Sequence, residues 1–360
     1  MKKSLLFALL VLLSTVFALP AFAAQPLVKM PTAWMDEYAG FNIWYAKKMG
    51  WDKEEGLDIE MLLFSTGPAQ MEALPSKTWV LGSTGIGGQL VGGIRHKIYI
   101  VAPSKSEGLM HDMFLRPGHP ATKVKGWNPK FPDVYGSPET VKGMTILYTA
   151  QTTTHYMAGK WLEIFGLTPN DVKMVNMDAT SIVPAFEKGV GDAAFLWAPL
   201  TFAAEARGWP SGGTMEQIGS PTVSALVGDR DWCDANPELV AKFLRIWFRT
   251  NNMVVAEGPS DRIVAEYRQF MNDFSGIKLT PEEAKKDIQV NPCWTYEEVM
   301  KLVDTSNGMS QAERWQLDVA DFFVSIGRFT PQEIEKFKAA KVNTDKFLKM
   351  VQLPIPDWRK

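Results

Sequence analysis

The 360-residue chain is poor in the side chains from which metal centres and disulfide frameworks are built. It contains two cysteines, Cys233 and Cys293, and four histidines that lie far apart in the sequence. A zinc site takes three or four Cys, His or carboxylate ligands, so we expect neither a metal nor another cofactor. The two cysteines could form a disulfide in an oxidising compartment or remain two buried thiols, and their spacing leaves both alternatives open.

An excess of charge of one sign is also missing. The chain has 38 Lys and Arg against 40 Asp and Glu, which gives a net charge of −2, and it has no long basic run. Binding to nucleic-acid phosphates needs clustered Lys and Arg, so nucleic acid is excluded as the main partner. A content of 46% hydrophobic and 22% charged residues is that of an ordinary globular protein. The length predicts two domains.

A long apolar run occurs at the N-terminus. Lys2 and Lys3 precede the apolar stretch 5–13, and Ala21-Phe22-Ala23 has the A-x-A form of a cleavage site. The run is shorter than the roughly 20 residues that a membrane-spanning helix needs, and no cysteine near the cleavage site offers a lipid anchor. We therefore expect residues 1–23 to be a signal peptide and the mature protein to be periplasmic.

The rest of the chain has the pattern of an α/β protein followed by a helical extension. Short apolar runs alternate with helical patterns, and Gly or Pro stands at most junctions. After residue 236 oxygen-bearing caps precede four stretches of helix formers, at Ser260, Thr280, Ser310 and Thr330. The predicted strands cover 27–31, 57–64, 79–81, 98–102, 144–148, 172–176 and 193–197.

Hydroxyl side chains are frequent where the predicted strands end and helices begin. Ser65-Thr66, Ser83-Thr84 and Thr152-Thr153-Thr154 all stand at such junctions. In open parallel sheets ligands bind at the carboxyl ends of the strands, and helix N-termini favour anions. Together the three turns predict an oxyanion site, and the alternative for each is that its hydroxyls cap their own helix.

Other side chains with binding chemistry stand beside the same junctions. Trp34 and Trp197 could pack against the carbon part of a ligand, Asp178 could accept from a ligand amine, and His155 could contact a ligand. Core packing or helix capping is the alternative for each of them. No G-x-S-x-G motif, P-loop or Cys-His pairing is present, so we do not expect an enzyme.

A colinear series of segments resembles a known group of proteins. Phe64-Ser65-Thr66-Gly67-Pro68, Val141-Lys142-Gly143 and Trp197-Ala198-Pro199 are similar in order and spacing to segments of the nitrate, sulfonate and taurine group of ABC-transporter solute-binding proteins. The resemblance implies a type II periplasmic binding protein fold, α/β with two lobes, a ligand cleft between them and a helical C-terminal extension. It places lobe 1 at 24–112 plus 226–360 and lobe 2 at 113–225, with crossings near 110–116 and 223–229.

The resemblance also implies a function. The chain would be the exported substrate-binding component of an ABC importer, a monomer that captures a small organic anion, taurine-like, sulfonate or nitrate-like, and delivers it to a membrane permease and its ATPase. The alternatives are a binding protein for a thiamine-precursor pyrimidine or another heterocycle, and an exported enzyme or sensor accessory on the same fold. The implied ligand contacts are Thr32, Trp34, Ser65, Thr66, Ser83, Thr84, Thr152, Thr153, Thr154, His155, Asp178 and Trp197.

Overall fold

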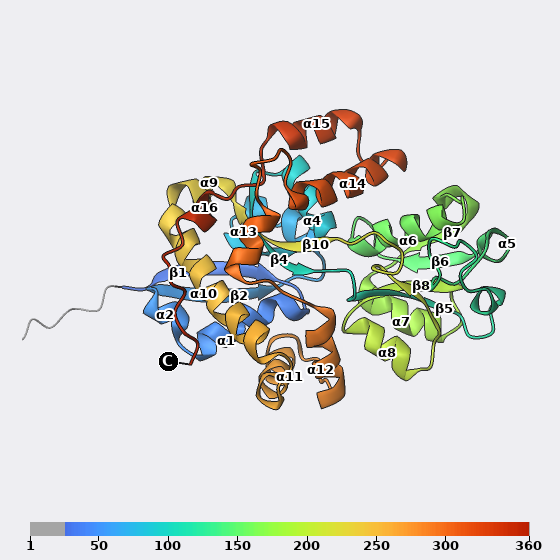
Figure 1. Cartoon of the computed structure of the whole chain (residues 1–360), viewed down its shortest axis with the longest axis horizontal. Helices are drawn as coiled ribbons and strands as arrows, with labels where there is room; N and C mark the ends of the chain where they lie inside the picture. The colour runs from blue at the N-terminus through green and yellow to red at the C-terminus, as the bar shows by residue number, and fades with distance from the viewer. Residues whose placement is uncertain (1–25, 360) are drawn as a thin grey trace, which may run out of the picture.

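Two five-stranded sheets lie side by side in the molecule, each with helices packed against it (Figure 1). The structure is a computed structural model that describes residues 26–359. The expected signal peptide, residues 1–23, lies outside the described residues. The predicted α/β class is confirmed.

Sheet A is built from the N-terminal strands and one strand from late in the chain. Its strand order is β2 (Leu57–Leu63), β1 (Val28–Trp34), β3 (Leu81–Thr84), β10 (Val223–Asp229) and β4 (Ile98–Ser106). β1 runs parallel to β2 and β3, whereas β10 is antiparallel to both β3 and β4. The carboxyl ends of β1, β2 and β3 therefore meet at one edge of the sheet.

Sheet B has the same mixed arrangement. Its strand order is β7 (Lys173–Asn176), β6 (Thr145–Tyr148), β8 (Ala193–Trp197), β5 (His111–Leu115) and β9 (Ser211–Thr214). β6 is parallel to β7 and β8, and β5 is antiparallel to β8 and β9. The chain passes from sheet A to sheet B between Ser106 and His111 and returns between Thr214 and Val223. Both connections lie a few residues before the crossings expected from the sequence.

Helices connect the parallel strands of each sheet. Around sheet A they are η1 (Tyr38–Gly40), α1 (Phe41–Lys48), α2 (Trp51–Glu54), α3 (Gly67–Glu72), η2 (Leu74–Ser76) and α4 (Ile86–Arg95). Around sheet B they are η3 (Pro120–Lys123), α5 (Pro138–Val141), α6 (Thr153–Ile164), η4 (Pro169–Asp171), α7 (Ala179–Glu187) and α8 (Leu200–Ala206).

The C-terminal part of the described chain is helical, as predicted, and gathers around sheet A (Figure 1). It contains α9 (Arg230–Ala235), α10 (Pro237–Glu257), α11 (Asp261–Ser275), α12 (Pro281–Val290), α13 (Tyr296–Leu302), α14 (Gln311–Ser325), α15 (Pro331–Ala339) and α16 (Lys346–Lys349). Thr280, Ser310 and Thr330 each form a capping box, and Ser260 caps α11, so all four predicted helix starts are confirmed. Among residues 26–359, no helix is both long enough and apolar enough to cross a bilayer.

The two cysteines are free thiols in this fold. Cys233 is buried in α9, and Cys293 follows α12 with its sulfur 3.9 Å from the Tyr38 hydroxyl. The disulfide that the sequence left open is therefore not formed, and the alternative of two separate thiols is the one found.

Candidate functional site

A cavity lies where loops from the two sheets meet, and its empty space of about 430 Å³ is partly open to solvent. Residues on the sheet A side, on the sheet B side and on the connection between them all contribute to its wall. We call it the inner cavity. Its lining residues are Met35, Glu37, Thr66, Gly67, Pro68, Gly85, Gly87, Gly88, Lys105, Glu107, Met110, His111, Thr152, Thr153, Trp197 and Ser224.

Three helices begin at this cavity. The Thr66 side chain caps α3, whereas α4 and α6 begin after Gly85 and Thr152 without a side-chain cap. The first turn of α4 lies against the turn that precedes α6, because a Cβ atom at Gly87 would overlap the carbonyl oxygen of Gln151. The N-terminal amides and positive dipole ends of two helices from different sheets therefore converge on one place.

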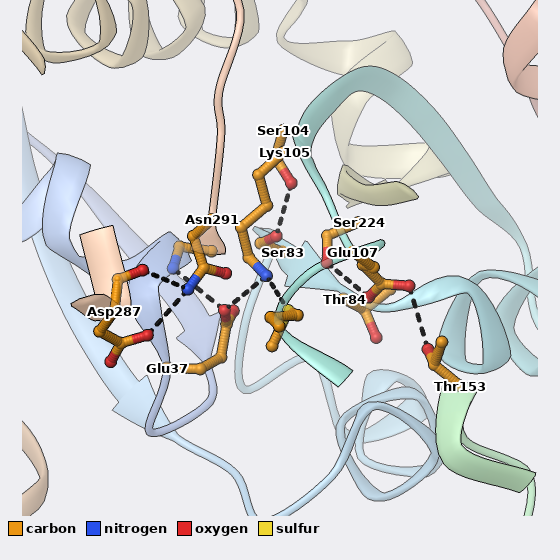
Figure 2. Close-up of polar contacts among 12 residues, drawn as sticks. Glu37, Ser83, Thr84, Ser104, Lys105, Glu107, Thr153, Ser224, Asp287 and Asn291 are labelled. Carbon is orange, nitrogen blue, oxygen red and sulfur yellow. Dashed lines mark hydrogen bonds and ion pairs between the residues drawn. The ribbon is translucent and has the colours of Figure 1, made fainter. Parts of the chain in front are cut away.

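A buried ion pair forms part of the cavity wall. Lys105, near the end of β4, extends toward Glu37, and its Nζ lies 3.0 Å from Glu37 Oε2 (Figure 2). The same Nζ lies 2.7 Å from the sulfur of Met110. Both charged side chains are almost fully buried. Burying two charges costs desolvation free energy, and a buried charge that loses its partner strongly destabilises the fold. The Lys105–Glu37 pair is therefore a fixed feature of the cavity.

A second carboxylate, Glu107, lies on the connection between the sheets. Ser224 and Thr222 each donate a hydroxyl to it at 2.7 Å, and Thr153 from the first turn of α6 donates at 3.1 Å (Figure 2). Glu107 thus joins both connections between the sheets to the α6 N-terminus. It is also buried.

Glu107 and its neighbour His111 form a buried pair in which the pKa of each group is lowered. Burial raises the pKa of Glu107, but the charges of His111 and Lys105 and the hydroxyl donors together hold that pKa below its usual value. Burial lowers the pKa of His111 by more than the nearby Glu107 carboxylate raises it. The lining of the inner cavity thus contains two carboxylates, Glu37 and Glu107, and one lysine, Lys105.

Several residues predicted from the sequence lie at this site. Thr66, Thr152, Thr153 and Trp197 line the inner cavity. Ser65 and Asp178 line an adjoining outer cavity that shares Thr66 and Trp197 with the inner one. The outer cavity encloses about 750 Å³ and is lined by Asp36, Leu63, Phe64, Ser65, Thr66, Asp178, Ala179, Thr180, Trp197 and Leu200.

Four other predicted residues lie in the core beneath the cavity. The Trp34 indole donates to Thr32 Oγ1 at 2.7 Å and stacks on Trp247 with ring centroids 5.9 Å apart. Ser83 pairs with Ser104 at 3.2 Å. Thr84 is fully buried, and a Cβ at Gly67 or Gly88 would overlap its hydroxyl. Thr32, Trp34, Ser83 and Thr84 therefore support the cavity floor and do not line it.

The remaining two, Thr154 and His155, lie within the first turn of α6. Thr154 Oγ1 is 2.8 Å from Thr152 Oγ1. His155 faces away from the inner cavity. Its ring packs on the ring of Tyr148, with centroids 4.5 Å apart. Contact of any of the twelve residues with a ligand stays a prediction.

Sequence reasoning missed the charged lining, which consists of Glu37, Lys105 and Glu107. The strand predicted at 98–102 continues in the structure as β4 to Ser106. The signal that could have found these residues is Lys105-Ser106-Glu107, two opposite charges directly after a buried strand. Among residues 26–359, no group of three or more His, Cys, Asp or Glu side chains could hold a metal ion.

This architecture, two mixed sheets joined by two connections with a cavity between them, is the periplasmic binding protein fold. The model of the NMT1-like family matches residues 25–266, and the chain belongs to this family. Its relatives include a protein of Brachyspira hyodysenteriae named as an ABC transporter periplasmic binding protein, 25% identical over 79% of this chain and 78% of that protein. The taurine-binding periplasmic protein of Escherichia coli is 32% identical over 30% of this chain and 34% of its own length.

Solved structures of similar fold agree with this assignment. The alkanesulfonate-binding protein of Xanthomonas axonopodis pv. citri, bound to MOPS, has a TM-score of 0.67 at 16% identity and covers 89% of this chain and 99% of its own. The periplasmic nitrate-binding protein of Synechocystis PCC 6803 has a TM-score of 0.66 at 15% identity over 92% of this chain and 91% of its own. The family model and the relatives confirm the resemblance to ABC-transporter periplasmic binding proteins, and the relatives are named as binding proteins.

Proposed function

We propose that the protein is the exported substrate-binding component of an ABC importer and that it captures a small amino sulfonate such as taurine in the inner cavity. In this proposal the two sheets with their helices are lobes, 24–112 plus 226–360 and 113–225, which close on the ligand. The closed monomer then delivers the ligand to a membrane permease and its ATPase in the inner membrane.

The convergence of helix N-termini carries the proposal. An oxyanion placed against the first turns of α4 and α6 would meet backbone amides that no side chain caps. Thr66 lies in the same wall, whereas the hydroxyls of Thr152 and Thr153 donate to the Thr149 carbonyl and to Glu107. Helix N-termini bind phosphate, sulfate and carboxylate groups through such backbone amides. The sulfonate group of a ligand has the charge and the acceptor oxygens that such donors require.

The buried carboxylates define the other end of the ligand. An anion without a positive group would enter a cavity lined by two carboxylates and one lysine, and the carboxylates oppose its binding. An ammonium group near Glu107 would instead gain a charge-assisted hydrogen bond. Glu107 thus replaces Asp178, the amine partner expected from the sequence, because Asp178 is exposed at the N-terminus of α7 and lines the outer cavity.

The lining residues come from both sheets, which supports ligand-driven closure. Thr66 and Gly85 follow strands of sheet A, and Thr152 and Trp197 follow or end strands of sheet B. A ligand that contacts both sets at once binds the closed arrangement more tightly than an open one and so shifts the population toward it.

A cationic heterocycle is the second candidate. Glu37 and Glu107 supply negative charge, and Met35, Met110 and Trp197 supply polarisable apolar surface in the same cavity. An aminopyrimidine could lie between these groups. It would make little use of the helix N-termini, however, which is why the amino sulfonate is preferred.

A thermal-shift panel on the chain without residues 1–23 tests the proposal. The panel contains taurine, ethanesulfonate, nitrate and a 4-aminopyrimidine. A ligand that binds the native state raises the melting temperature by an amount that grows with the logarithm of its concentration over its dissociation constant, and we expect the largest rise with taurine. A rise with the aminopyrimidine and none with the sulfonates would support the second candidate and overturn the first.

A further inference from the structure

The turn before α6 is held in an uncommon backbone conformation. Gln151 has φ = +58°, in the left-handed region that residues other than glycine rarely adopt. Its backbone amide donates to Nδ1 of His155 at 3.2 Å. A strained residue persists where its surroundings hold it in place, and this hydrogen bond is one of the contacts that hold Gln151.

The same turn forms one wall of the ligand cavity. Thr152 and Thr153, the next two residues, line the inner cavity, and the Gln151 carbonyl lies against Gly87 at the start of α4. A change in the Gln151 conformation would therefore move hydroxyls of the cavity wall and alter the approach of α4 to α6.

His155 is in turn fixed by a helix from the far end of the chain. Its ring centroid lies 5.4 Å from that of Phe323 and 5.9 Å from that of Phe322, both in edge-to-face geometry. Phe322 also packs edge-to-face on Tyr156 and lies so close to Gly159 that a Cβ there would overlap its ring. The two phenylalanine rings thus pack against one face of the first turns of α6.

Helix α14, which carries these rings, also contacts the sheet A side. It packs on α4, and the Gln316 amide donates to Gln89 Oε1 of α4 at 3.0 Å. In Figure 1 this helix extends from above α4 toward α6. The helix that supports the cavity turn is thus anchored to the same helix, α4, that closes the cavity from the other side.

We propose that His155 is a positioning residue for the ligand cavity, and that Phe322 and Phe323 of α14 hold it in place, so that the C-terminal extension is part of the binding apparatus. The effect that we expect on ligand binding rests on the proposed function. The geometric part does not, because the Gln151–His155 hydrogen bond joins two groups of the chain itself. Burial, reinforced by the Arg328 charge, lowers the pKa of His155 to about 3, so at pH 7 the neutral ring keeps an acceptor for Gln151.

Hydrogen exchange on the ligand-free protein tests the geometric part. In His155→Asn the side-chain oxygen can still accept from the Gln151 amide, whereas His155→Leu has similar size and no acceptor. We expect exchange within residues 149–154 to be at least tenfold faster in the Leu variant than in the Asn variant, with exchange in sheet B equal in both. Equal exchange of residues 149–154 in the two variants would overturn the proposal.

The role of α14 has its own matched pair. Phe322→Leu removes a ring that contacts α6, and Phe337→Leu removes a similarly buried ring of α15 that packs on Gly93 of α4. Phe322→Leu should speed exchange within 149–154, and Phe337→Leu should not, although both lower the melting temperature. If the two variants change that segment alike, α14 has a general stabilising role and the proposal is wrong.

Titration with taurine then separates this inference from the proposed function. We expect His155→Leu to bind taurine at least tenfold more weakly than wild type and His155→Asn to bind within threefold of it. If wild type binds taurine and the Leu variant binds equally well, the positioning role is refuted. If wild type does not bind taurine, the proposed ligand is wrong, and the exchange experiment still decides whether His155 positions the turn.

Discussion

Lys286 of α12 and Glu205 of α8 form an ion pair between the two halves of the molecule, with Lys286 Nζ 2.5 Å from Glu205 Oε2. α12 belongs to the helices around sheet A and α8 to those around sheet B (Figure 1). Both side chains are more than a third exposed. Exposed ion pairs contribute about 0.2–1 kcal/mol, so this one can bias the closure of the cleft without locking it.

Exchanging the two charges of this pair should restore the taurine affinity that is lost when one charge is reversed. Glu205→Lys places two cations in contact and should weaken taurine binding by about fivefold, because the closed arrangement loses its attraction and gains a repulsion. The double variant Glu205→Lys with Lys286→Glu should return to within twofold of wild type. Titration calorimetry at low salt measures both, and a double variant as weak as the single one would show that the pair does not favour closure.

Gly87→Ala should impair closure while leaving each half folded. The added Cβ would overlap the Gln151 carbonyl of the facing turn, so the first turns of α4 and α6 could not approach as they do. We expect taurine affinity to fall at least tenfold. In the presence of ligand, the radius of gyration from X-ray scattering should be larger for the variant than for wild type.

A glycine with room for a side chain supplies the control. Gly108 lies on the connection between the sheets, and a Cβ there would meet Glu216 at an ordinary 3.5 Å. Gly108→Ala should therefore change affinity less than threefold. If Gly87→Ala is as mild as Gly108→Ala, the contact between α4 and the Gln151 turn is not needed for closure.

Glu107→Gln should weaken ligands that carry an amine. A hydrogen bond to a charged group is worth about 1.5–3 kcal/mol, so taurine affinity should fall by roughly 10- to 100-fold. Ethanesulfonate has no amine, and its affinity should stay equal or rise. Asp178→Asn is the matched control and should change taurine affinity less than threefold, because Asp178 lies on the outer cavity. Equal losses for taurine and ethanesulfonate in the Glu107 variant would contradict the assigned role of Glu107.

Asp112→Asn should stabilise the protein in a pH-dependent way. Burial raises the pKa of Asp112 from 3.8 to about 7, although Ser211 donates to it at 2.8 Å. Between pH 4 and 7 the folded protein binds a proton that the unfolded chain releases, so this group lowers stability as the pH rises.

The Asn side chain of the Asp112→Asn variant does not ionise, so the variant avoids the loss of stability that Asp112 causes as the pH rises. The variant should be more stable than wild type by about 2–4 kcal/mol at pH 8, and the difference should shrink below about 1 kcal/mol near pH 4. Urea unfolding at several pH values measures it. A difference that does not depend on pH would show that Asp112 ionises normally in the fold.

Much of the fold could be predicted because its signals are local. Ser and Thr caps followed by Glu mark the starts of α12, α14 and α15, and apolar runs between glycines mark the parallel strands. Strands β5 and β10 lie where the sequence predicts only crossings, near 110–116 and 223–229. Each pairs antiparallel with strands distant in sequence, and that pairing depends on how the two halves of the chain assemble, which no local pattern records.

The site could be predicted in part for the same reason. Hydroxyls after strands identified Thr66, Thr152 and Thr153, because the carboxyl ends of parallel strands meet at one edge. The sequence could not show that Trp34 stacks in the core on Trp247, or that Lys105 reaches Glu37 across 68 positions of sequence. Buried charge pairs depend on tertiary contacts, and so does the support that Phe322 and Phe323 give to His155.

Isothermal titration of the chain without residues 1–23 with taurine at pH 7 decides whether the protein binds an amino sulfonate. We expect one site with a dissociation constant in the micromolar range or tighter, and binding of ethanesulfonate at least tenfold weaker. Absence of heat with taurine and with every simple sulfonate, in protein shown to be folded, would contradict this expectation.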